Sequence, residues 1–236
     1  MAQLAHYRII GYAVTLVLHI GNTIVIKTAL KSRSDDPEIR TLAFLEDCFY
    51  TIWNVVFQVM YAAFGIYCDL KSLKDDADHG KLTKYMKYRQ YVFGALLCPS
   101  SMFIVNIFWP IFLYDRNLIY PEYIDRAFPD ESNYIMHIAI LPVVLWELIF
   151  LPRKIPISHR KYIVFFSMVY VAYLLRIFHV NANHGLWPYP ILEKIQGTIF
   201  FPILFILAYL MLYGHYYLQW KITRFIWGYV DIMKSS

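Results

Sequence analysis

The chain has 236 residues and is more apolar than a soluble domain, with 59% hydrophobic residues, 17% charged residues and a mean hydropathy of +0.43. Soluble domains average about 45–50% apolar and about 25% charged residues, so this composition excludes a disordered chain and a disulfide framework and disfavours a single soluble domain. The net charge of +5 comes from lysines and arginines in short gaps between apolar runs. This distribution is typical of the loops of a membrane protein and predicts no nucleic-acid partner.

Six apolar runs approach the length of about 20 helical residues that crosses a bilayer. They cover residues 9–26, 43–66, 91–114, 134–151, 162–180 and 198–217. None alternates apolar and polar residues as a membrane β-strand would, so each is predicted to be a helix. The sequence therefore predicts an all-α, polytopic membrane protein with a single six-helix domain over residues 1–236. The first run lacks a cleavage site and is predicted to be a retained helix rather than a signal peptide.

The orientation of the six spans follows from the lysines and arginines in the gaps. Fourteen of them lie at the termini and in the second and fourth loops, and seven lie in the other three loops. This excess predicts that both termini are cytoplasmic. The basic residues of the second loop, Lys71 to Arg89, are interpreted as an anchor that contacts membrane lipids.

Polar residues follow one face of the second run at spacings of four, three and four: Asp47, Thr51, Asn54 and Gln58. At about 100° per residue they fall on one stripe of a helix, which must face protein or water. One interpretation is that this stripe only binds neighbouring helices by hydrogen bonds. The other is that it carries part of a functional site.

The fourth run begins with Asn133 and His137, four residues apart. The second and fourth runs both start on the non-cytoplasmic side, so Thr51 and His137 are expected in the same half of the bilayer. Asn106 and Arg176 are expected in that half too. A hydroxyl, an imidazole, amides and a guanidinium in an apolar setting are the groups of an acyl-transfer site.

In such a site a threonine hydroxyl is a nucleophile only when a neighbouring base takes its proton. We expect Thr51 to be the nucleophile and His137 the general base. Asn54, Asn106 and Asn133 are candidates to orient these groups or to stabilise the oxyanion. Arg176 either binds a substrate carboxylate or forms a structural ion pair with Asp47.

Several short segments between residues 44 and 193 resemble the androgen-induced membrane protein family. The segments are Thr51-Ile-Trp-Asn-Val-Val-Phe-Gln58, Cys68-Asp69-Leu70, Phe108-Trp109, Tyr114-Asp115-Arg116, Ile119-Tyr120-Pro121, Met136-His137, Leu141-Pro142 and Gly185-Leu-Trp-Pro-Tyr189-Pro190. Their order and spacing, more than any one of them, carry the resemblance.

The resemblance implies a six-helix threonine hydrolase of fatty acid esters of hydroxy fatty acids, in which Thr51 and His137 match the catalytic residues. It implies no cofactor, a lipid substrate that enters from the bilayer, and a location in the endoplasmic reticulum, with the plasma membrane as the alternative. The oligomeric state is left open.

The sequence offers three other functions. A metal enzyme is disfavoured because the histidines are scattered and show no helical metal-ligand spacing. A transporter could use Asp47, Glu147 and Arg176, but the sequence has no internal repeat. The main alternative is a non-enzymatic scaffold or regulatory membrane protein whose polar residues only hold helices together.

Overall fold

The computed structural model describes residues 2–74 and 79–228, which form helices and connecting loops without any strand. Six helical segments are long and apolar enough to cross a membrane: Gln3–Ser32, Tyr50–Ser72, Gly80–Leu118, Asp130–Phe150, Arg160–His184 and Phe200–Trp227. Each contains most of one predicted run, so the all-α, six-span architecture is confirmed. Lys234, which contributed to the orientation count, lies outside the described residues.

The first two spans form a pair of adjacent helices. Helix α1 (Ala2–Ser32) leads through α2 (Pro37–Phe44) and the short 3-10 helix η1 (Glu46–Cys48) into α3 (Tyr50–Ser72). Gly65 of α3 lets the two helices approach, because a Cβ atom there would lie 2.7 Å from the ring of Tyr12. Of the polar stripe, Thr51, Asn54 and Gln58 are on α3 and are buried inside the bundle.

The third span is one continuous helical rod of three parts. It consists of α4 (His79–Val92), a π-helical segment η2 (Phe93–Leu97) and α5 (Cys98–Asp115). Pro99 cannot donate the backbone hydrogen bond that would bind the carbonyl of Ala95, which explains why the helix widens just before it. Two 3-10 helices, η3 (Arg116–Leu118) and η4 (Glu122–Arg126), then lead to the fourth span.

The fourth span is interrupted, whereas the sequence predicts one helix over residues 134–151. Helix α6 (Asp130–His137) ends and, after two intervening residues, α7 (Ile140–Phe150) begins. Pro142 has no N–H to donate to the carbonyl of Ile138, so a regular helix cannot continue through this point. The N–H of Leu141 donates to that carbonyl instead, at 3.0 Å. The interruption places His137 at the end of a helix.

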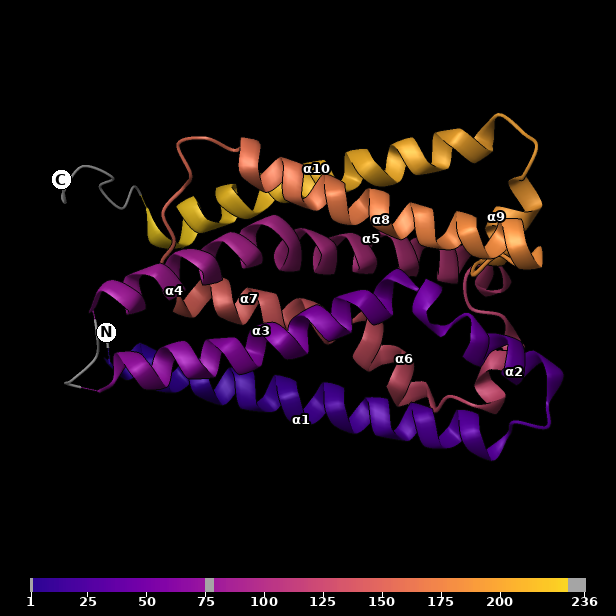
Figure 1. Cartoon of the computed structure of the whole chain (residues 1–236), viewed down its shortest axis with the longest axis horizontal. Helices are drawn as coiled ribbons and strands as arrows, with labels where there is room; N and C mark the ends of the chain where they lie inside the picture. The colour runs from indigo at the N-terminus through magenta and orange to yellow at the C-terminus, as the bar shows by residue number, and fades with distance from the viewer. Residues whose placement is uncertain (1, 75–78, 229–236) are drawn as a thin grey trace.

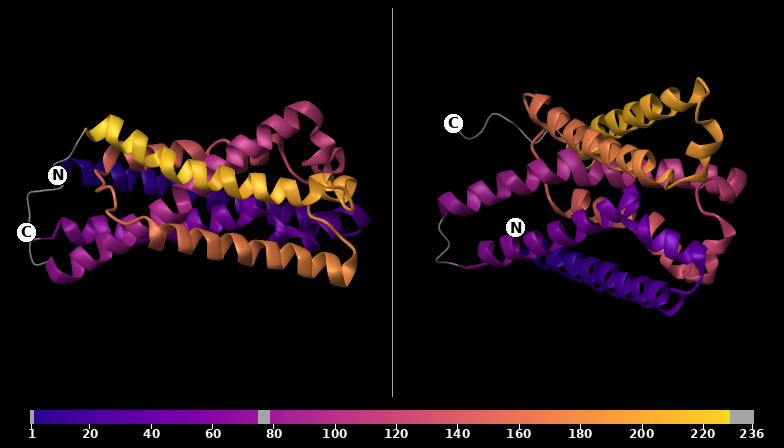
Figure 2. Two further views of the ribbon diagram at one scale, coloured as in Figure 1. Left: turned by 90° about the horizontal axis from the view of Figure 1, so that it is seen from above. Right: turned by 45° about the vertical axis from the view of Figure 1, so that its right-hand side comes forward.

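The last two spans are α8 (Arg160–His184) and α10 (Phe200–Trp227), joined by the short helix α9 (Pro190–Ile195). Both views in Figure 2 show α8 and α10 running lengthwise along the bundle. Helix α1 begins and α10 ends at the same end of the bundle, and α2, α6 and α9 lie toward the opposite end (Figure 1). This second group of elements forms the half of the molecule that contains the site.

Large apolar side chains cover much of the outside of the bundle. Val17, Leu113 and Leu175 are 76%, 78% and 66% exposed, and many more apolar side chains on the six spans are exposed with them. In water such a surface would promote aggregation, but hydrocarbon solvates it well. The exposed surface therefore has the composition of a lipid-facing one.

A network of buried charges joins the helices at the end of the bundle where α1 begins. Arg8 donates to Asp69 at 2.6 Å, and Arg89 bridges Asp69 at 3.0 Å and Glu147 at 3.4 Å. Arg153 also pairs with Glu147, and all five side chains are at most 7% exposed. The interpretation of Arg89 as part of a lipid anchor is therefore wrong, because its guanidinium is fully buried between helices. Buried charges need such partners because transfer out of water is costly.

Candidate active site

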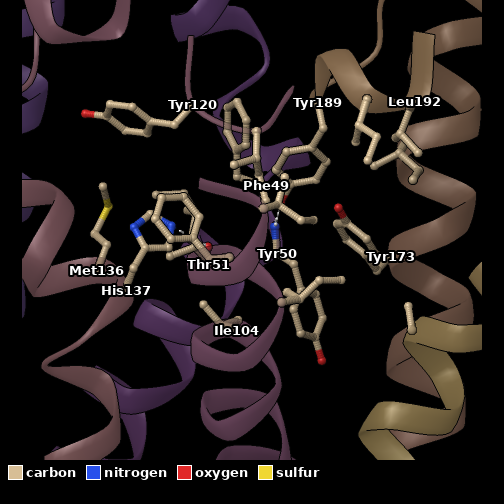
Figure 3. Close-up of a pocket in the computed structure, with 18 of the residues that line it drawn as sticks. Phe49, Tyr50, Thr51, Ile104, Tyr120, Met136, His137, Tyr173, Tyr189 and Leu192 are labelled. Carbon is tan, nitrogen blue, oxygen red and sulfur yellow. Dashed lines mark hydrogen bonds between the residues drawn. The ribbon is translucent and has the colours of Figure 1, made fainter. Parts of the chain in front are cut away.

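An apolar cavity lies in the half of the bundle near α2, α6 and α9. All six spans contribute residues to its lining, the fourth through α6 and not through α7. The short elements α2, η1 and α9 contribute as well. Of the side chains that line it, all are apolar or tyrosine except Glu46, Thr51 and His137. Figure 3 shows Thr51 and His137 next to each other among these apolar groups. The cavity is suited to an apolar ligand that meets very few polar atoms.

Thr51 and His137 are in direct contact although 86 positions separate them in the chain. The distance between Thr51 Oγ1 and His137 Nε2 is 3.2 Å. Thr51 is the second residue of α3 and His137 the last residue of α6. The two residues are only 8% and 6% exposed. A buried hydroxyl thus lies within hydrogen-bond distance of a buried imidazole.

The other ring nitrogen of His137 fixes the tautomer. His137 Nδ1 lies 3.1 Å from the backbone carbonyl oxygen of Asn133. A carbonyl only accepts hydrogen bonds, so a neutral ring carries its proton on Nδ1 and presents the lone pair of Nε2 to Thr51. The Thr51 hydroxyl then donates to Nε2. This is the arrangement that a general base needs to take the hydroxyl proton.

Two neighbouring aromatic residues of α5 hold His137. The ring of Phe108 stacks on the imidazole, with ring centroids 3.6 Å apart and planes inclined by 11°. Trp109 Nε1 donates to the backbone carbonyl of His137 at 3.0 Å, which gives a partner to a carbonyl at the end of α6. These contacts restrict both the plane of the ring and the position of its backbone.

Thr51 is positioned by the first turn of α3. Phe49 precedes this helix and provides no side-chain cap, and the N–H of Tyr50 donates to the hydroxyl of Tyr189 at 3.2 Å. Burial raises the pKa of Tyr189, so its hydroxyl stays protonated at neutral pH. Tyr189, immediately before α9, thus provides a partner that the α3 N-terminus would otherwise lack.

On α3, one residue of the polar stripe faces the cavity and the other two contact neighbouring helices. Thr51 faces the cavity, whereas Gln58 Nε2 donates to the carbonyl of Ile140 at 3.1 Å and to Ser101 Oγ at 3.0 Å. Asn54 accepts from Ser101 at 3.2 Å, and its side chain does not line the cavity. Gln58 and Asn54 therefore hold helices together, which is the structural interpretation of the stripe.

Asp47 is not on the helix that carries Thr51. The sequence places the start of this helix near residue 43, but α3 begins at Tyr50 and Asp47 lies in η1. Thr51 is consequently in the first turn and not two turns inside the helix. Asp47 is 64% exposed at its side chain, where it pairs with Arg176 of α8.

The expected convergence of the amides and the guanidinium on one site is wrong. Asn106 binds His215 of α10 at 2.8 Å, and neither it nor Arg176 lines the cavity. Asn133 contributes its backbone carbonyl to His137, while its buried side-chain oxygen has no hydrogen-bond partner within residues 2–74 and 79–228. Helical periodicity did not determine which neighbouring helix each of these side chains would face.

Sequence reasoning missed the roles of Tyr189 and Phe108. Both occur in segments that carry the family resemblance, but an aromatic residue at the end of a membrane helix is ordinarily interfacial. Their contacts with Tyr50 and His137 cross between elements far apart in the chain. In the described part of the chain no three histidine, cysteine or acidic side chains are grouped as metal ligands would be.

Comparison with known proteins confirms the family resemblance that the short sequence segments carry. The family model described as FAR-17a/AIG1-like protein matches residues 14–224. The chain belongs to this family. It is 31% identical over 182 residues to the mouse androgen-dependent TFPI-regulating protein, with 76% of each chain covered.

Two further relatives extend this comparison. The chain is 30% identical over 204 residues to the human androgen-induced gene 1 protein, with 79% of each chain covered. A membrane protein of Schizosaccharomyces pombe is 25% identical over 119 residues, which is 48% of this chain and 52% of the yeast protein. No solved structure matches the chain. The family and the six apolar spans together identify a multi-pass membrane protein.

Proposed function

We propose that this protein is an intramembrane lipid ester hydrolase with Thr51 as nucleophile and His137 as general base. The observation that carries the proposal is the contact of 3.2 Å between the Thr51 hydroxyl and the imidazole inside an apolar cavity. Family members that this sequence resembles cleave fatty acid esters of hydroxy fatty acids, and we propose the same class of substrate here. We also propose that the protein is located in the membrane of the endoplasmic reticulum.

The first half of the reaction is acyl transfer to the protein. His137 Nε2 takes the proton of the Thr51 hydroxyl while Oγ1 attacks the carbonyl carbon of the ester. The tetrahedral intermediate then breaks its bond to the alkoxide oxygen, which receives the proton from the imidazolium. The hydroxy fatty acid leaves, and the acyl group remains as an ester of Thr51.

The second half returns the free protein. A water molecule gives its proton to His137 Nε2 and attacks the acyl-threonine carbonyl. Collapse of this second intermediate breaks the bond to Oγ1, which takes the proton back, and the fatty acid is released. The Nδ1–H bond to the Asn133 carbonyl stabilises the imidazolium in both halves.

The oxyanion needs hydrogen-bond donors near Thr51. The backbone N–H of Thr51 lies in the first turn of α3, which has no side-chain cap, whereas those of Tyr50 and Ile52 donate to the Tyr189 hydroxyl and the Phe49 carbonyl. Asn54 is one turn further along α3, and its side chain does not line the cavity, although its buried Nδ2 has no hydrogen-bond partner in the part of the chain that the structure describes. The Thr51 N–H is therefore the donor that we propose in place of Asn106, which binds His215 elsewhere in the bundle.

The cavity suits an ester with long acyl chains. Its walls are hydrocarbon and aromatic, and it extends from Ile26 of α1 across the bundle to Ala208 of α10. An ester bound there meets the hydroxyl and imidazole away from bulk water, where hydrogen bonds and charges act more strongly. A soluble ester would lose its hydration on entering and gain little in return.

The test is covalent labelling by a fluorophosphonate probe together with hydrolysis of a panel of lipid esters. Thr51→Ala and His137→Ala should each abolish labelling and hydrolysis. Thr223→Ala and His159→Ala are matched controls, because these residues bind Gln219 and Tyr216 outside the cavity. Hydrolysis at the wild-type rate by Thr51→Ala protein that reaches the membrane would refute the proposal.

The alternative is a scaffold or regulatory protein without catalysis. The hydrogen bonds of Asn54 and Gln58 favour it, since they show that most of the stripe joins helices. A relative named for regulation of TFPI is consistent with it. Absence of both labelling and hydrolysis in correctly inserted wild-type protein would support this alternative.

A further inference from the structure

A second, more polar cavity lies directly beside the catalytic one. It is lined by Asn22, Thr23, Lys27, Ala43, Phe44, Asp47, Val55, Val56 and Arg176, together with Ile26, Glu46, Ile52 and Met136, which also line the first cavity. Two of these shared residues are the chain neighbours of the catalytic pair, since Ile52 follows Thr51 and Met136 precedes His137. The wall between the cavities therefore lies next to the proposed reacting atoms.

The second cavity contains two ion pairs that link different elements. Lys27 of α1 pairs with Glu46 of η1, and Arg176 of α8 pairs with Asp47. Arg176 holds the Asp47 carboxylate by two hydrogen bonds, from Nε to Oδ2 at 3.1 Å and from Nη2 to Oδ1 at 2.8 Å. A guanidinium that makes two parallel bonds to a carboxylate has the geometry for recognising any carboxylate.

The pair between Arg176 and Asp47 is accessible. The two side chains are 30% and 64% exposed, so an incoming carboxylate can reach the guanidinium without displacing any group other than Asp47. Another carboxylate can therefore replace Asp47 on Arg176 at low cost. The buried pairs at the other end of the bundle, such as Arg89 with Asp69 at 0% exposure, offer no such exchange.

We propose that Arg176 binds the free carboxylate of the lipid ester substrate, and that Asp47 is a resident carboxylate which the substrate displaces. The inference rests on the proposed function. With the carboxylate in the polar cavity, the hydrocarbon passes Ile52 and Met136 and the ester reaches Thr51 in the apolar cavity. The site then selects esters that carry a free acid over neutral lipid esters.

The kinetic experiment compares a fatty acid ester of a hydroxy fatty acid with its methyl ester, which lacks the charge. For Arg176→Gln, the ratio of kcat/KM for the free acid to kcat/KM for the methyl ester should fall about tenfold or more, mainly through KM. For Asp47→Asn the ratio should rise, because the competing carboxylate is gone. A purely structural ion pair would move the ratio little and would make the two variants behave alike, and that result would overturn the proposal.

Arg126→Gln is the matched control. Arg126 is another exposed arginine paired with carboxylates, those of Asp36 and Glu38, and it lines neither cavity. The ratio should be unchanged in this variant. A change equal to that of Arg176→Gln would show a general effect of surface charge and would contradict a specific site.

A binding measurement separates this inference from the proposed function. The probe is a fluorescent long-chain fatty acid, its methyl ester or a long-chain alkyl phosphate, and the protein is full-length Thr51→Ala in detergent micelles. Binding of the acid that is weakened by Arg176→Gln and strengthened by Asp47→Asn supports the carboxylate site even if wild-type protein hydrolyses nothing. Equal binding of acid and methyl ester, or tighter binding of the phosphate, overturns it.

Discussion

The imidazole of His137 and the ring of Phe108 are stacked almost in parallel, 3.6 Å apart at their centroids. Phe108 also stacks on Phe112 and packs edge-on against Tyr120, so its own ring is fixed by neighbours on α5 and the following loop. The rigidity of this aromatic group is therefore transmitted to the side chain that we propose as the base.

Phe108→Leu should lower hydrolysis without removing the catalytic groups. Leucine keeps most of the apolar contact but cannot stack, and aromatic pairs contribute about 0.5–1.5 kcal/mol beyond area burial. If that amount is lost in orienting His137, kcat falls roughly two- to tenfold. Steady-state kinetics on a lipid ester measures this. The control is Phe165→Leu, because Phe165 stacks on Tyr91 and does not line the cavity. An unchanged kcat for Phe108→Leu would show that stacking does not position the ring.

Asn133→Ala should retain hydrolysis within about threefold. The orienting contact to His137 Nδ1 comes from the backbone carbonyl of residue 133, and alanine preserves that carbonyl in α6. The side-chain oxygen that is lost has no partner in the described residues, so little hydrogen-bond energy is removed. A loss of a hundredfold or more would mean that the amide side chain acts in the reaction.

Tyr189→Phe should reduce kcat and leave the fold intact. The ring keeps its edge-on contact with Phe49, with centroids 5.5 Å apart, but the N–H of Tyr50 loses the hydroxyl that accepts from it. A neutral hydrogen bond contributes about 0.5–1.5 kcal/mol, so we expect roughly a two- to tenfold effect if it is expressed in Thr51 positioning. Thermal unfolding and kinetics should be measured on the same preparation. A drop in Tm with unchanged kcat would assign Tyr189 to stability alone.

Glu147→Ala should destabilise the protein strongly. The variant leaves Arg89 and Arg153 buried without the carboxylate that both contact, and it removes the partner of the Tyr61 hydroxyl, at 2.5 Å. Breaking a buried pair in this way costs about 3–5 kcal/mol. Asp47→Ala, which breaks an exposed pair, should cost less than about 1 kcal/mol. Unfolding midpoints in detergent compare the two, and equal midpoints would contradict the structural role of the network.

Cys48 should be unreactive although it lies three residues before Thr51. Burial raises the pKa of its thiol to about 11, with Arg176 opposing and Asp47 adding to the shift. The group is neutral below its pKa, so at pH 8 almost none of it is the nucleophilic thiolate. Maleimide labelling followed by mass spectrometry should find Cys48 unmodified in the folded protein and modified after denaturation. Rapid labelling of the folded protein at pH 8 would contradict this assignment.

The sequence by itself determined the six spans, because apolar length reports directly on membrane crossing, and it predicted that Thr51 and His137 lie in the same half of the bundle. Only the tertiary structure decided which polar residues meet. Helix α6 ends at His137, and the chain becomes helical again only at Ile140, in the helix that contains Pro142. Because α3 begins at Tyr50 rather than near residue 43, Thr51 reaches the imidazole while Asp47 turns outward to Arg176. Arg89 is a second residue whose partners only the tertiary structure decided. In the sequence it belongs to a basic loop, but in the bundle it is buried between the carboxylates of Asp69 and Glu147. The sequence pattern does not determine how each helix is rotated about its axis, so it could not predict these partners.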